Sequence, residues 1–137
     1  MSVVTDVRSL LDAPSAAVLT TYRKGGSALV TPVWFRHTDG VFEVVIAEGD
    51  VKLQHLRRDP RCGLVVFEAV PPFRGIEVRG EAELVACDVR TIRAAIAGRY
   101  LGVEAGERFA AERSKPGVLL RLAGAQRTWD LSAILPS

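Results

Sequence analysis

Apolar residues occur along this chain in short runs that are separated by turn-forming residues. Residues 16–22, 28–35 and 41–47 are rich in β-branched and aromatic side chains, a composition typical of strands. The connections between these runs are short and contain glycine. One connection includes the pair Asp39-Gly40, which is a strong hairpin signal. This pattern predicts three consecutive antiparallel strands.

The second half of the chain continues the pattern and contains one long segment in which apolar and charged residues alternate. Further strands are expected at residues 62–70, 76–85, 117–124 and 126–131. Gly80 lies inside the alternating segment and suggests a bulge or a close backbone approach. The sequence thus predicts six to seven antiparallel strands.

Helical spacing of apolar residues predicts four helices around these strands. Thr5 or Asp6 is the expected N-cap of the first helix, and Asp88 is the expected N-cap of the third. Because the connections between strands are too short for parallel pairing, they favour a mainly β barrel with helices at its ends (α+β) over a doubly wound parallel sheet. The helices are expected within residues 5–14, 49–61, 88–102 and 104–114.

Composition narrows the class of protein. The 137 residues, 48% hydrophobic and 25% charged, fit one domain that spans residues 1–137. The net charge of +2 gives no support for a nucleic-acid or anionic membrane partner, so any anion site must be local. No apolar run reaches the length of a membrane span and no leader-like segment is found, so we expect a soluble cytoplasmic protein.

Common catalytic and metal motifs are not found in the sequence. Cys62, Cys87, His37 and His55 are too few and too scattered to predict a metal site. The chain contains neither a nucleophile motif nor a phosphate-binding glycine loop, so no catalytic residue is assigned. Sequence motifs therefore do not identify a catalytic activity for this chain.

The segment from Gly49 to Arg61 is one candidate binding site. Unpaired N–H groups at a helix start carry partial positive charge, so residues 49–52 could hold a phosphate, with Lys52 adding a full charge. Basic helices are more often solvent-exposed faces, however. Asp50 would also repel an anion unless it turned away or capped the helix. From the residues alone, both interpretations stay open.

The segment Thr31 to Phe35 is a second candidate. Pro32 cannot donate a ladder hydrogen bond and therefore belongs at a strand edge or a bulge. Free backbone groups beside Trp34 would suit a planar heterocycle whose ring atoms need hydrogen bonds. The alternative is a core tryptophan next to a proline bulge, since buried aromatic residues mostly serve packing.

In their order along the chain, these segments resemble a known family. Residues 16–35, 40–68 and 71–84, together with the closing segment 127–131, are similar to the pyridoxamine 5'-phosphate oxidase-like split β-barrel family. The closer similarity is to its small actinobacterial branch, which binds the deazaflavin coenzyme F-420. The resemblance implies a split β-barrel like that of FMN-binding proteins. It also implies a homodimer with two flavin-type sites at the subunit interface.

The resemblance also implies which residues contact the cofactor. The backbone of residues 32–34 would line the ring system, and Lys52 would meet the phosphate. Relatives usually carry a non-acidic residue at the position of Asp50 and often asparagine at that of His55, so this chain departs from the family pattern twice. A histidine could still donate a hydrogen bond there. The implied cofactor-binding residues are Pro32, Val33, Trp34, Gly49, Asp50, Lys52, His55, Arg58, Arg74 and Arg79, some of the arginines coming from the second chain.

The function implied by the resemblance is hydride transfer from reduced F-420 to an electron-poor small molecule. An FMN-dependent reductase or oxidase of the same fold is the alternative enzyme. The many arginine residues favour F-420, because its oligoglutamyl tail carries more negative charge than FMN. A third hypothesis is a non-catalytic protein that binds flavin, haem or a tetrapyrrole, with His37 or His55 as an axial ligand.

Overall fold

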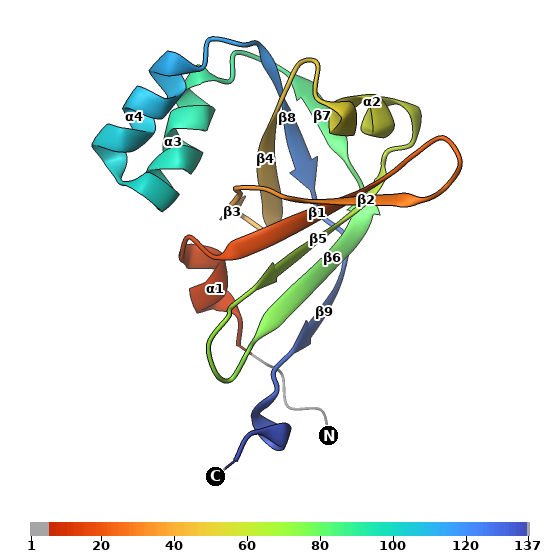
Figure 1. The fold of residues 1–137 in the computed structure, drawn as a ribbon, viewed down its shortest axis with the longest axis vertical. Coiled ribbons are helices and arrows are strands. Elements are labelled where there is room, and N and C mark those ends of the chain that lie inside the picture. The colour runs from red at the N-terminus through yellow and green to blue at the C-terminus, as the bar shows by residue number, and fades with distance from the viewer. Residues whose placement is uncertain (1–5, 137) are drawn as a thin grey trace.

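The computed structural model describes residues 6–136, which form two antiparallel sheets and four α-helices (Figure 1). The sheets contain nine strands among the described residues, so the expected number of six to seven was too low. The five-stranded sheet has the order β2 (Ala28–Pro32), β1 (Ala16–Tyr22), β5 (Arg61–Phe67), β6 (Gly75–Glu81) and β9 (Ala125–Trp129). The four-stranded sheet has the order β3 (Arg36–Thr38), β4 (Val41–Ala47), β8 (Gly117–Leu122) and β7 (Glu83–Ala86). This is the predicted α+β split barrel.

The core lies between the inner faces of the two sheets. Alternate residues of β1 and β5 are buried, as expected for strands with one face toward the core. The opposite sheet contributes a nearly continuous buried run in β8. The largest fully buried side chains include Phe35, Phe42, Leu19, Leu64 and Leu120. Burial of these apolar surfaces is the main force that holds the sheets together.

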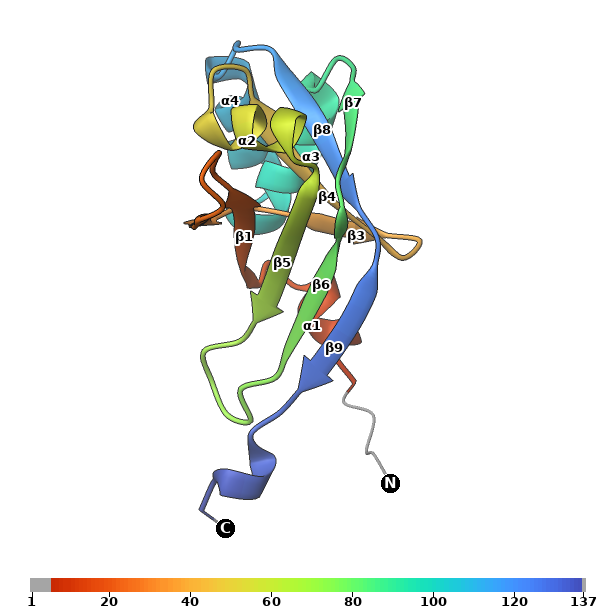
Figure 2. The ribbon, with the colours of Figure 1, turned by 90° about the vertical axis from the view of Figure 1, so that its right-hand side faces the viewer.

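The helices gather at one end of the barrel. Figures 1 and 2 show α2 (Val51–Arg58), α3 (Arg90–Leu101) and α4 (Val103–Glu112) at the end opposite the described chain ends. Helix α1 (Arg8–Asp12) lies beside the barrel, and a 3-10 turn (Ser132–Ile134) follows β9. No helix among residues 6–136 is both long and apolar enough to cross a membrane.

Two segments that were each predicted to form one strand are interrupted in the structure. Of residues 28–35, only residues 28–32 form a strand, β2, because after Pro32 the chain crosses to the other sheet and β3 begins at Arg36. Residues 76–85 divide at Ala82 for the same reason, since β7 pairs with β8 in the second sheet. Residues 28–35 are apolar on both sides of Pro32, and the alternation of residues 76–85 continues across Ala82, so the hydrophobic pattern could not show either break. The close approach predicted at Gly80 is confirmed, because a Cβ atom there would lie 2.7 Å from the carbonyl oxygen of Ala123.

The predicted N-caps of α1 and α3 were each wrong by one residue. Val7 and Val89, not Asp6 and Asp88, occupy the N-cap positions of α1 and α3. The Asp6 carboxylate nevertheless accepts a hydrogen bond from the Arg8 N–H at 3.0 Å. Thr5 lies outside the described residues.

The segment between β2 and β3, residues 33–35, is held by α3. The Val33 N–H donates to the Ala17 carbonyl at 3.0 Å, and the Phe35 N–H donates to the Tyr100 hydroxyl at 3.3 Å. The same hydroxyl donates to the Ser15 carbonyl at 3.0 Å. The crossing between sheets therefore keeps its backbone hydrogen bonds, as buried polar groups require.

We expect that the substitution Tyr100→Phe lowers the free energy of unfolding by about 1–3 kcal/mol, because it leaves the Phe35 N–H and the Ser15 carbonyl without their partner. Urea unfolding followed by circular dichroism measures the change. Tyr22→Phe is the control, since the half-buried Tyr22 ring lies under Arg61 at the edge of the barrel, and its effect should stay within about 0.5 kcal/mol. Equal effects of the two substitutions would contradict the role given to Tyr100.

Candidate functional site

A pocket of about 550 Å³ lies at the helical end of the barrel. Its walls come from residues 32–34, from β4, from the start of α2 and from the α3–α4 pair with the segment that follows it. Two stretches that the sequence analysis selected independently, residues 32–34 and the start of the basic helix, thus face the same pocket. The volume lies within the range of small-molecule sites.

The apolar wall of the pocket is built around Trp34. Its ring stacks on Tyr100 with the ring centres 5.1 Å apart and the planes at 12°, and it lies at 47° to Phe109 at the same separation. Trp34 therefore packs against both helices and lines the pocket as well. The two interpretations of this tryptophan, packing and binding, are compatible.

The polar end of the pocket contains Asp50 and Lys52. Gly49 turns the chain with a φ of 91°, in the left-handed region that favours glycine, and Asp50 then caps α2. The Asp50 carboxylate accepts the Lys52 N–H and the Lys52 ammonium group, each at 2.9 Å. Partial burial opposes ionisation of Asp50, but these hydrogen bonds hold its pKa below the usual range. Asp50 is thus both a helix cap and the counter-ion of Lys52.

Helix α3, α4 and the following loop add charged residues that the sequence analysis missed. Arg93 is buried and lines the pocket, where its Nη1 donates to the carbonyls of Arg113 and Lys115. A signal was present, because Arg93 follows the buried Val89 by four positions and precedes Ile96 by three. An arginine at that spacing lies on the buried face of a helix. The other charged residues of this wall are Glu112, Arg113 and Lys115.

Two of the predicted site residues on α2 lie away from the pocket wall. His55 is buried and faces β1, where its Nδ1 shares a hydrogen bond of 2.9 Å with the Thr21 hydroxyl. Arg58 is exposed and donates to the Tyr22 carbonyl at 2.9 Å. Both residues join α2 to β1 in this chain.

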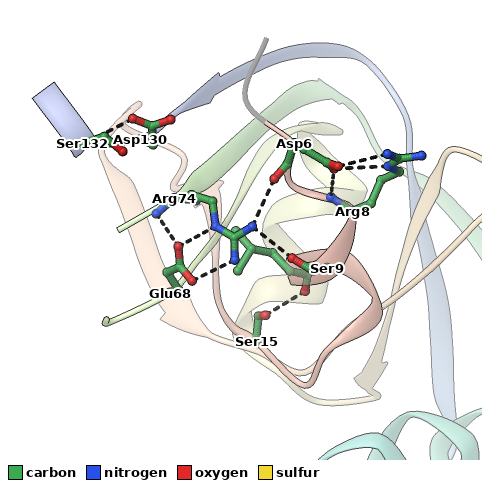
Figure 3. A network of polar contacts seen from close by, with 9 residues as sticks. Asp6, Arg8, Ser9, Ser15, Glu68, Arg74, Asp130 and Ser132 are labelled. Atoms are coloured by element: carbon green, nitrogen blue, oxygen red, sulfur yellow. Dashed lines mark hydrogen bonds and ion pairs between the residues drawn. The ribbon is translucent and has the colours of Figure 1, made fainter. Parts of the chain in front are cut away.

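Arg74 and Arg79 also lie outside the wall of this pocket. Arg74 forms an ion pair with Glu68 at 2.7 Å and contacts Ser9, which joins the loop before β6 to α1 (Figure 3). Arg79 pairs with Glu77 of the same strand at 3.2 Å. Within one chain, neither arginine is brought to Lys52.

The remaining titratable candidates are engaged elsewhere. His37 packs against Phe42 with ring centres 4.6 Å apart, and burial lowers its pKa. Burial raises the pKa of the Cys62 thiol to about 11, so this thiol stays protonated. Within residues 6–136, no group of three His, Cys, Asp or Glu side chains is placed to hold a metal ion.

Solved structures of similar fold include proteins with different ligands. The protein Rv2991 of Mycobacterium tuberculosis has 21% identity and a TM-score of 0.80, with 98% of this chain and 91% of that chain covered. An F-420 reductase has 22% identity and a TM-score of 0.67, covering 91% and 98%. The haem storage protein HutZ of Vibrio cholerae has 16% identity and a TM-score of 0.69, covering 90% and 91%. At these identities the likeness establishes the fold.

The family is established by sequence. No curated protein matches this chain. Residues 4–127, however, match the family model described as pyridoxamine 5'-phosphate oxidase, and this range includes both sheets up to β9 and every residue placed at the pocket. The match covers most of the chain and agrees with the split-barrel fold, so the protein belongs to the pyridoxamine 5'-phosphate oxidase family.

Proposed function

We propose that this protein is an oxidoreductase that binds coenzyme F-420 in the pocket beside Trp34 and serves hydride transfer to an electron-poor small molecule. One observation carries the proposal: the apolar segment 32–34 and a cluster of basic residues line the same pocket. The similar fold of an F-420 reductase supports the choice of cofactor.

The lining of the pocket fits a flat molecule with an anionic end. Pro32, Val33 and Trp34 present an apolar surface together with backbone groups. Four basic and two acidic side chains line the pocket, so its net charge is positive. The basic residues are Lys52, Arg93, Arg113 and Lys115, and the acidic residues are Asp50 and Glu112.

The residues of the chain would place the cofactor and keep its surroundings dry. The bound deazaflavin would supply the hydride chemistry itself. The rigid stack of Trp34 on Tyr100 fixes one wall, and Phe109 covers a second side of the indole. The Tyr100 hydroxyl is engaged by backbone groups on both sides, so it is given a structural role here.

The haem-binding alternative has less support from this pocket. Among the described residues that line it, none is histidine, cysteine or methionine, the usual axial ligands from nitrogen and sulfur. His37 and His55, which the sequence analysis considered, lie outside its wall. Absorbance of the purified protein separates the cofactors, because haem gives a sharp Soret band that flavins and deazaflavins lack.

The active form would be a homodimer that forms around the edge of the five-stranded sheet. Strand β2 is one of the two edge strands of this sheet, and the Val30 side chain on it is 56% exposed. Val51, at the start of α2, is 48% exposed. Apolar side chains on an open strand edge are unfavourable in a lone chain, so a second copy that covers them would be stabilising. Some of the arginines outside the pocket, Arg58, Arg74 and Arg79, could then reach the partner's site.

The substitution Lys52→Ala is expected to weaken binding of F-420 and of FMN about tenfold or more, because a hydrogen bond between charged groups would be lost. Calorimetric titration with the two cofactors side by side measures the loss. Lys24→Ala, in the exposed turn between β1 and β2, is the control and should leave the affinity unchanged. If the wild-type protein bound neither cofactor, the proposed function would fail.

The substitution Asp50→Asn is expected to strengthen binding of a phosphate-bearing cofactor several-fold (about 1 kcal/mol), because the Lys52 charge loses its counter-ion while asparagine still caps α2. The pKa of Asp50 is held below its usual range, so the wild-type carboxylate stays ionised and the difference should persist from pH 8 down to pH 5. Titrations across this range test it. Asp88→Asn, at an exposed ion pair away from the pocket, is the control. A weakened affinity in Asp50→Asn would show that the carboxylate itself contacts the ligand.

A further inference from the structure

Arg93 is a buried cation that has no anionic partner among the residues that the structure describes. The residue is 8% exposed, and no carboxylate oxygen of residues 6–136 lies within 4.0 Å of its guanidinium nitrogens. Isolated charges in protein interiors are strongly disfavoured unless something compensates them. Among the partly buried arginines, Arg36 and Arg74 are paired with Glu43 and Glu68. Arg99 has no carboxylate partner, but three backbone carbonyls and the Phe35 ring surround its guanidinium.

Only one edge of the Arg93 guanidinium is used within the chain. Its Nη1 donates to the Arg113 carbonyl at 2.9 Å and to the Lys115 carbonyl at 3.0 Å. The Nε and Nη2 atoms make no hydrogen bond with the described residues. These two atoms form the edge of the guanidinium that binds carboxylate and phosphate groups through two parallel hydrogen bonds.

Close packing against the start of β8 fixes the position of Arg93. Gly117 packs against the guanidinium, and a Cβ atom at that position would lie 3.0 Å from Nη2. The same Cβ atom would lie 3.0 Å from the carbonyl oxygen of Ile46, so a larger residue at the start of β8 would crowd both Arg93 and the backbone of β4. The bonds from Nη1 tie the arginine to the loop that joins α4 to β8, so its side chain is held without being neutralised.

The other charges of the pocket do not neutralise Arg93. Asp50 is committed to Lys52 at 2.9 Å, and Glu112 forms no ion pair with Arg93. The two basic residues Arg113 and Lys115 line the same pocket, and the Arg113 guanidinium lies 3.9 Å from the centre of the Phe109 ring. The positive charge on this wall is therefore available to a ligand.

We propose that Arg93 forms an anion-binding subsite of the pocket, which takes a phosphate or a carboxylate group through its Nε and Nη2 atoms. The subsite deepens the proposed function, on which it rests only for the identity of the ligand. The anion has two possible sources in that function, the phosphate of the cofactor and an acidic group of the substrate. The same hydrogen-bond chemistry serves both.

Paired ligands that differ only in the anion test the subsite. We would titrate wild type, Arg93→Gln and Arg93→Lys with FMN and riboflavin, and with F-420 and its phosphate-free chromophore. A third arm would titrate benzoate, as a carboxylate probe, into protein saturated with FMN or F-420. Inorganic phosphate alone would be the fourth ligand. Arg90→Gln is the control, because Arg90 lies on the same helix but is exposed and paired with Asp88.

If the cofactor phosphate occupies the subsite, Arg93→Gln should weaken FMN or F-420 about tenfold or more and leave the phosphate-free partners unchanged. If the substrate occupies it, the cofactors should bind equally well to the variant, while benzoate affinity falls by a similar factor. Arg93→Lys keeps the charge but loses the two-pronged geometry, so it should give an intermediate loss in either case. Thermal unfolding would establish that each variant is folded, and Arg93→Lys decides the result if Arg93→Gln does not fold.

Two results separate this proposal from the function on which it rests. Unchanged affinities for all anions in folded Arg93 variants, with cofactor still bound, would overturn the subsite and leave the oxidoreductase proposal standing. Binding of inorganic phosphate or benzoate that depends on Arg93, in a protein that binds neither F-420 nor FMN, would support the subsite and overturn the cofactor assignment.

Discussion

The hydrogen bonds from α3 to Phe35, in the crossing between the sheets, are the constraint on which the site depends. A chain that passes from one sheet to the other loses its ladder partners, and its buried backbone groups need new ones. Tyr100 accepts from the Phe35 N–H, and Arg99 donates to the Phe35 carbonyl and to the carbonyls of Leu11 and Ala13. Burial lowers the pKa of Arg99, yet these carbonyls and the Phe35 ring beneath the guanidinium keep the charged side chain in place.

Helix α3 also contributes side chains to the wall of the pocket. Arg93 and Tyr100 are seven residues apart on α3, which is about two helical turns, so they lie on one face of the helix. One end of this face fixes Trp34, and the other end carries the cation. Helix α4 can approach closely because Gly106 packs on Gly98, where a Cβ atom would lie 2.5 Å from the Gly98 nitrogen. This approach brings Phe109 against Trp34.

The parts of the structure that could be predicted from sequence are those governed by local periodicity. The strand β4 has the predicted bounds 41–47, and residues 32–34 and Lys52 were selected before their shared pocket was known. The divisions at residues 33–35 and at Ala82 could not be predicted, because they depend on which sheet accepts the next strand. The placement of Arg93 depends on two carbonyls that lie 20 and 22 residues further along the chain. Such distant partners have no signature in a local pattern.

Lys52 was expected both to donate a hydrogen bond to an anion and to supply the positive charge that attracts it. In the pocket, these two roles belong to different residues. Lys52 is the proposed phosphate ligand, but Asp50 holds its ammonium group and offsets its charge at distances that favour the ion pair. A bound anion would have to share that ammonium group with a carboxylate. Arg93 has no such competitor within residues 6–136, and the backbone carbonyls that anchor it are neutral. The net attraction for an anion therefore comes from α3 and the loop after α4, while the start of α2 contributes hydrogen-bond donors at nearly balanced charge. On the sequence alone, Asp50 argued against an anion site at the start of α2. It is compatible with a basic pocket, because the compensating positive charge comes from α3 and from the loop after α4.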